Sequence, residues 1–113
     1  MHELSICQSL ISMIENEARR QSFHKVRQIH LEIGRFAAVD PEALRFGFEV
    51  ASRDTLCEGA ELHIIDLPGI AYCFTCEETV ALGDRLAPCP KCGGGRLQAT
   101  GGDELKVKDL EVI

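Results

Sequence analysis

Four cysteines in the second half of the chain have the spacing of a metal site. They form two Cys-x2-Cys pairs, Cys73 with Cys76 and Cys89 with Cys92, separated by twelve residues. A gap of two residues lets both sulfur atoms of a pair face one ion, and Gly93 suits the tight turn of the second pair. Four thiolates around a tetrahedral ion favour Zn²⁺ and leave no open position for water or substrate. We therefore predict a structural zinc site.

Other uses of these cysteines stay open at this point. Tetrahedral thiolate sites also accept iron, so a rubredoxin-like electron carrier is one alternative. A zinc-ribbon adaptor that binds nucleic acid is another. Six cysteines could form disulfides in a secreted protein, but the chain does not start with the residue order of a signal peptide. Cys7 and Cys57 do not fit the spacing; we expect Cys7 to be a buried structural thiol and assign no role to Cys57.

The first three residues offer a second set of metal donors. His2 places its imidazole, its backbone amide and the Met1 α-amine in fused chelate rings. Nitrogen donors in a near-planar arrangement suit Ni²⁺ and Cu²⁺, and Glu3 could add a carboxylate. The alternative is a plain helix start, where Glu3 favours the helix dipole.

The other three histidines show no spacing that would make them ligands of one ion. For His24, His30 and His63 we expect surface or structural roles.

The sequence also predicts two helices. The first covers residues 3–21, where apolar residues recur at intervals of three and four. The second begins at Asp40 and Pro41, a capping residue followed by a proline in the first helical position. The expected inner faces comprise Ile6, Leu10, Met13, Ile14 and Ala18 in the first helix, and Leu44, Phe48 and Ala51 in the second.

Strands are predicted at residues 25–35, 60–67 and 103–113. In the first strand, Ile29 and Ile33 alternate with polar residues, while Val26 is out of phase and predicts an irregular end. The last strand has a phase shift between Val107 and Leu110, which indicates a bulge. The predicted fold is therefore α+β, with two helices packed on a small sheet of about three strands.

Residues 70–102 differ in character from the rest of the chain. Apolar periodicity is lost there, and the four paired cysteines and many glycines appear. Because strands flank this segment, we predict an inserted four-cysteine, zinc-ribbon-like domain at 70–102 within a main domain of residues 1–69 plus 103–113. A segment with so few apolar residues needs its metal to fold.

Composition narrows the function further. Twelve Lys and Arg against 18 Asp and Glu give a net charge of −6, which argues against a nucleic-acid partner. No run of about 18 apolar residues is present, so we expect no membrane association and a cytoplasmic protein. No nucleophile–base pair or phosphate-binding loop is recognisable, so we expect no enzymatic activity.

Taken together, the motifs resemble the HypA/HybF family, accessory proteins that deliver nickel during maturation of nickel–iron hydrogenase. The features that carry the resemblance are the initial MHELS, LEIG on the first strand, PEALRF in the second helix and the four-cysteine insertion, so it covers essentially the whole chain. It implies a nickel-binding α/β domain with ligands Met1, His2 and Glu3. It also implies structural zinc at Cys73, Cys76, Cys89 and Cys92.

The resemblance also implies a function and partners. The chain would be a nickel metallochaperone, not an enzyme, working with a nickel-handling GTPase and with the precursor of the hydrogenase large subunit. Some members of the family also serve urease maturation. We expect a monomer or a homodimer.

Overall fold

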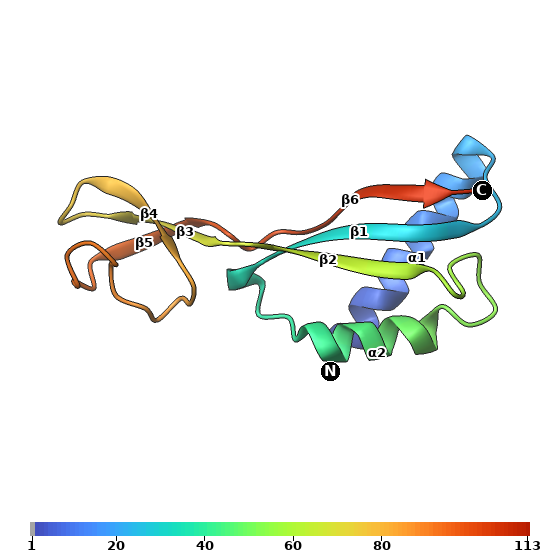
Figure 1. The fold of residues 1–113 in the computed structure, drawn as a ribbon, viewed down its shortest axis with the longest axis horizontal. Helices are drawn as coiled ribbons and strands as arrows, with labels where there is room; N and C mark the ends of the chain where they lie inside the picture. The colour runs from blue at the N-terminus through green and yellow to red at the C-terminus, as the bar shows by residue number, and fades with distance from the viewer. Residues whose placement is uncertain (1) are drawn as a thin grey trace. The chain divides into compact units, whose positions relative to one another are not determined.

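The structure is a computed structural model that describes residues 2–113. Its described part confirms the α+β class, with two α-helices and two small sheets (Figure 1). In chain order the elements are α1 (His2–Gln21), β1 (Val26–Gly34), the 3-10 helix η1 (Arg35–Ala37), α2 (Pro41–Ala51), β2 (Glu61–Leu67), β3 (Gly69–Cys73), β4 (Glu78–Leu82), β5 (Leu97–Gly101) and β6 (Leu105–Val112). No helix among the described residues has both the length and the apolar character that crossing a membrane requires.

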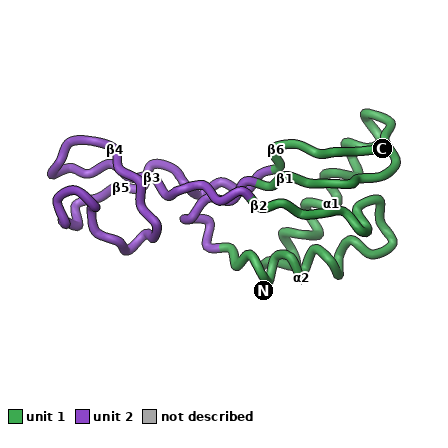
Figure 2. Tube along the Cα trace, viewed as in Figure 1, with its two compact units in different colours: residues 1–31, 39–64, 107–113 green, residues 32–38, 65–106 purple. Residues whose placement is uncertain are grey.

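The chain forms two compact units (Figure 2). Residues 1–31, 39–64 and 107–113 form unit 1, which contains both α-helices. Residues 32–38 and 65–106 form unit 2, which contains β3, β4 and β5. Strands β1, β2 and β6 each have residues in both units.

Helix α1 buries the face that its periodicity predicts. The buried apolar residues are Cys7, Leu10, Ile11, Ile14 and Ala18. Met13 was expected on this face but is 48% exposed, because it lies about 120° to 140° around the helix axis from Cys7 and Ala18, which are near the centre of the buried face. The helix ends at Gln21, because the next residue, Ser22, has a left-handed φ of 59°. The Phe23 N–H closes the last turn on the Ala18 carbonyl.

Helix α2 starts where its capping residue predicts. The Asp40 carboxylate accepts hydrogen bonds from the N–H groups of Glu42 and Ala43, at 3.0 and 3.4 Å. The two helices pack against each other, and Gly47 allows their close approach. A side-chain Cβ at Gly47 would lie 3.4 Å from the Cys7 sulfur and 3.5 Å from the Leu4 Cα, at the lower limit of ordinary van der Waals contact.

The first sheet has the strand order β2-β1-β6. The irregularities predicted for β1 and β6 are present in their burial patterns. Val26 and Ile29 are both buried although they lie three residues apart, so the alternation of β1 is broken between them. Val107 and Leu110, also three apart, are the two least exposed residues of β6.

The second sheet, in unit 2, is antiparallel with the order β4-β3-β5. Our prediction that apolar periodicity is lost from residue 70 was wrong for its first two strands, which alternate between buried and less buried residues. The pattern is weak in the sequence because β3 buries small residues, Ala71 and Cys73. A small core forms around them from Phe36, Val80, Leu82 and Cys89.

Phe36, in η1, supplies an aromatic ring to this core. Its ring lies against Gly69, where a Cβ would come within 2.3 Å of two ring carbons. The Arg85 guanidinium lies 4.8 Å from the ring centroid and donates a hydrogen bond to the Phe36 carbonyl. The η1 segment, which lies outside residues 70–102, therefore contributes to the core around the cysteines.

Candidate metal centres

The four paired cysteines meet in unit 2. Their sulfur atoms all lie within 4.8 Å of one another, with 3.8 Å from Cys73 to Cys92 and 3.9 Å from Cys76 to Cys89. A tetrahedral zinc ion with Zn–S bonds of about 2.3 Å places its sulfurs about 3.8 Å apart. The four cysteines are therefore clustered as a zinc-binding site, as their spacing predicts.

Both Cys-x2-Cys pairs adopt the same turn. The carbonyl of Cys73 accepts a hydrogen bond from the N–H of Glu77, and the carbonyl of Cys89 accepts one from Gly93, both at 2.8 Å. Glu77 and Gly93 have left-handed φ values of 56° and 73°. Glycine reaches this conformation without strain, which supports the predicted role of Gly93. The repeated geometry aims the sulfurs of both turns at one point.

Backbone N–H groups point at the sulfur atoms. The N–H of Cys76 lies 3.4 Å from the Cys73 sulfur, and the N–H of Gly94 lies 3.4 Å from the Cys92 sulfur. Such donors stabilise thiolate over thiol. Cys73 and Cys89 are buried, whereas Cys92 is exposed, so the site lies at the surface of unit 2.

Two of these thiols, Cys76 and Cys89, have pKa values that are shifted in opposite directions. Hydrogen bonds from the backbone of Cys92 and Lys91 lower the pKa of Cys89 to about 7. A hydrogen bond with Cys92, together with burial, raises the pKa of Cys76 to about 12. Without a metal, Cys76 therefore keeps its proton at neutral pH, and zinc binding must release it. The Lys91 ammonium, paired with Glu78, adds positive charge near the cluster.

The N-terminal candidate site lies in unit 1. The Glu3 carboxylate is buried, and its Oε2 atom accepts a hydrogen bond from the Asp40 N–H at 3.4 Å. The same oxygen lies 3.5 Å from Nε2 of His2, whose side chain is 59% exposed. Met1, the third expected nickel ligand, lies outside the described residues.

Glu3 therefore does more than favour the dipole of α1. The start of α2 holds its carboxylate, and burial together with that charge raises the pKa of the Cys7 thiol. Cys7 is buried, as predicted, and its thiol donates a hydrogen bond to the Leu44 carbonyl. The contact between Glu3 and Asp40 has no signal in the sequence, because the two residues belong to different helices.

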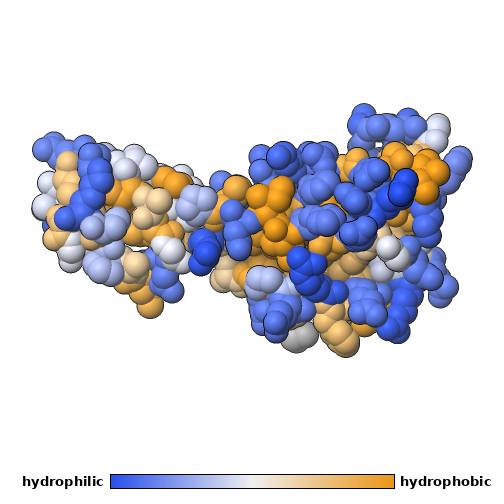
Figure 3. All heavy atoms as spheres, viewed as in Figure 1, coloured by the Kyte–Doolittle hydropathy of each residue, from blue (hydrophilic) through white to orange (hydrophobic). Residues whose placement is uncertain are grey.

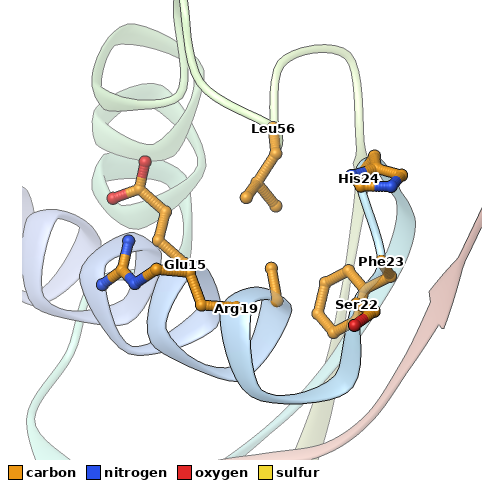
Figure 4. Close-up of a pocket in the computed structure, with 7 residues that line it drawn as sticks. Glu15, Arg19, Ser22, Phe23, His24 and Leu56 are labelled. Atoms are coloured by element: carbon orange, nitrogen blue, oxygen red, sulfur yellow. The ribbon is translucent and has the colours of Figure 1, made fainter.

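The remaining three histidines lie in two different surroundings. His24 is exposed after α1, beside a pocket of about 380 Å³ (Figure 4). Glu15 and His24 lie on opposite sides of that pocket, so they do not converge on one point. His30 and His63 are different: their rings stack with centroids 5.1 Å apart. Spacing in the sequence did not indicate that they meet.

A family model described as "Hydrogenase/urease nickel incorporation, metallochaperone, hypA" matches residues 1–112. The chain belongs to the HypA family. A hydrogenase maturation factor HypA from Beijerinckia indica is 56% identical to it, and one from Xanthobacter autotrophicus is 55% identical, each over the full length of both chains.

Solved structures of HypA proteins share the fold. The solution structure of the Ni metallochaperone HypA from Helicobacter pylori is 29% identical, with a TM-score of 0.70, covering 100% of this chain and 98% of that one. A second solution structure of a HypA protein is 28% identical, with a TM-score of 0.71. Membership of the HypA family confirms the resemblance on which the nickel interpretation rests.

Proposed function

We propose that this chain is a nickel metallochaperone that binds Ni²⁺ through Met1, His2 and Glu3. It passes the ion to the precursor of a hydrogenase large subunit. Nickel is thus its cargo. The family description names nickel incorporation, and the Helicobacter pylori relative is a nickel metallochaperone.

One structural observation carries the assignment of the ligands. The Glu3 carboxylate is held by the Asp40 N–H next to the exposed imidazole of His2. A donor that is already held loses little conformational freedom when it binds an ion. The exposure of His2 leaves the ion open to a receiving protein, which suits a site that must release its cargo.

We also propose that Cys73, Cys76, Cys89 and Cys92 ligate a resident zinc ion in a zinc-binding domain of residues 70–102. The nickel-binding domain then comprises residues 1–69 plus 103–113. Bound zinc would cross-link the two Cys-x2-Cys turns, and its four protein ligands would leave no open position for catalysis. The chain then acts as a carrier and not as an enzyme.

The partners follow from the same proposal. They are the nickel-handling GTPase of hydrogenase maturation and the large-subunit precursor, and for some systems the urease maturation proteins. The net charge of −6 disfavours nucleic acid. The free thiols suit the reducing cytoplasm, where we place a monomer or a homodimer.

Nickel binding by the untagged protein with its native Met1 tests the proposal. Mass spectrometry should find about one zinc ion per chain. Calorimetry should find tight binding of Ni²⁺, which we call the tight class. His2→Ala should lose the tight class and keep its zinc, whereas His24→Ala, a matched exposed histidine of the same unit, should change neither. Equal tight binding by His2→Ala and the wild type would refute the N-terminal site.

A further inference from the structure

His30 and His63 lie side by side on neighbouring strands of unit 1. His30 belongs to β1 and His63 to β2, and their rings stack with an interplanar angle of 23°. Their side chains are 33% and 45% exposed. Residues Ile29 and Leu31, on either side of His30, are buried, so His30 projects from the opposite face of the sheet.

That face is open to solvent. In Figure 1, α1 passes behind β1 and β6, and no helix of the described chain covers the near side of these strands. Figure 3 shows the near side of unit 1 as mostly hydrophilic residues with apolar patches between them. An ion can therefore reach side chains that project from this face.

We propose that His30 and His63, with the Glu61 carboxylate, form a second binding site for a divalent transition-metal ion. The site is separate from both centres described above and does not depend on the proposed N-terminal site. Two imidazole nitrogens and one carboxylate oxygen suit Ni²⁺, Cu²⁺ or Zn²⁺. Mg²⁺ and Ca²⁺ prefer oxygen ligands alone.

Each histidine already contacts a carboxylate. Nδ1 of His30 lies 2.5 Å from the Asp109 carboxylate on β6, and Nε2 of His63 lies 3.5 Å from Oε1 of Glu61. Histidines that bind metals commonly donate their other ring N–H to a carboxylate, which fixes the tautomer. With Asp109 at Nδ1, His30 keeps the lone pair of Nε2 for an ion. Asp109 is thus a positioning residue.

The separation of Nε2 in His63 from Oε1 in Glu61 also suits a shared ion. Two donor atoms, each about 2.1 Å from one tetrahedral ion, lie about 3.4 Å apart, close to the observed 3.5 Å. The stacked rings are nearly parallel, so His30 must turn to bring Nε2 onto the same ion, and the Asp109 side chain, which is 57% exposed, must turn with it to keep its contact with Nδ1. The terminal torsion of histidine is broad, and a partly exposed ring is free to make this turn.

The test uses zinc-loaded protein carrying His2→Ala, so that the proposed tight nickel site is absent. Ni²⁺ titrated into this protein should bind about one ion per chain, weakly. In proton–nitrogen NMR spectra, paramagnetic Ni²⁺ should selectively broaden the signals of residues around His30, His63 and Asp109. A merely structural histidine pair would not produce this pattern.

Further substitutions in the same protein identify the ligands. Adding His63→Ala, or the more conservative His63→Gln, should weaken binding at least tenfold and remove the broadening. Asp109→Asn should weaken binding by about 10- to 100-fold. Adding His24→Ala is the matched control and should leave binding unchanged.

Absence of Ni²⁺ binding in the His2→Ala protein would overturn the proposal, as would binding that both His63 variants leave unchanged. Neither result tests the N-terminal site. That site is tested by whether the tight Ni²⁺ binding of the wild type is lost in His2→Ala. Unchanged affinity in Asp109→Asn would overturn the positioning role of Asp109.

Discussion

The six cysteines of this chain fall into two chemical environments. Four lie together at the surface of unit 2 with backbone N–H groups directed at sulfur. Cys7 and Cys57 are fully buried in unit 1. Burial, with a smaller effect of the Glu15 charge, raises the pKa of Cys57 to about 11. Cys57, which the sequence left without a role, is thus a neutral core residue at physiological pH.

Burial of Cys57 should make stability depend on alkaline pH. Its pKa rises from 9.0 to about 11 on folding, so the folded state favours the neutral thiol. This contribution is complete below pH 9 and is lost as the pH rises towards 11, by about 2 to 3 kcal/mol in all. Urea unfolding of unit 1 between pH 8 and 11 should show this decline in the wild type.

The matched control is Cys57→Ala, which cannot titrate at this position. Its free energy of unfolding should be lower at pH 8 because a buried sulfur is lost, but it should decline less above pH 9. Parallel pH profiles for the two proteins would contradict the prediction.

At the start of α2, Asp40 makes two different kinds of hydrogen bond. The side chain of Asp40 caps the helix, and its backbone N–H holds the Glu3 carboxylate of α1. Gly47 lets α1 and α2 approach closely beside the same residues. The orientation of Glu3 therefore depends on where α2 begins.

Removal of the cap should destabilise unit 1. Asp40→Ala leaves the N–H groups of Glu42 and Ala43 without their acceptor, at a cost of about 1 kcal/mol. Asp40→Asn keeps an acceptor oxygen and should cost much less. Urea unfolding monitored by the helical circular dichroism signal measures both; an Asp40→Ala protein as stable as the wild type would show that the cap contributes little.

At the scale of the whole molecule, each unit has its own buried core. Unit 1 buries residues of both α-helices and of β1, including Leu10, Ile14, Ile29 and Leu44. Unit 2 has a much smaller core that includes two of the cluster cysteines themselves. A core this small provides little stability without a further cross-link.

Zinc removal should therefore unfold unit 2 selectively. After exhaustive chelation, NMR signals of residues 65–106 should collapse towards unfolded positions, while those of α1 and α2 persist. Cys92→Ser should weaken zinc binding and shift this transition to lower chelator concentration, whereas Cys57→Ser should not change zinc content. Loss of the helix signals together with those of unit 2 would show that zinc supports both units.

Much of this fold could be predicted from the sequence because its determinants are local. The face of α1, the cap of α2 and the breaks in β1 and β6 each depend on residues a few positions apart. The zinc cluster was predictable for the same reason, since two residues between cysteines set the geometry of each turn. The periodicity of β3 was missed because small residues bury without a strong apolar pattern.

Only the tertiary structure decided which residues far apart in the chain are in contact. Asp40 reaches Glu3 because α2 packs on α1, and His30 meets His63 because β1 and β2 are neighbours in one sheet. Phe36 joins the core of unit 2 from a segment outside the cysteine region. Sequence by itself determined the extent of α1, the start of α2 and the spacing of the four cysteines. Strand order and helix packing decided the rest, because they depend on how distant apolar faces are buried together.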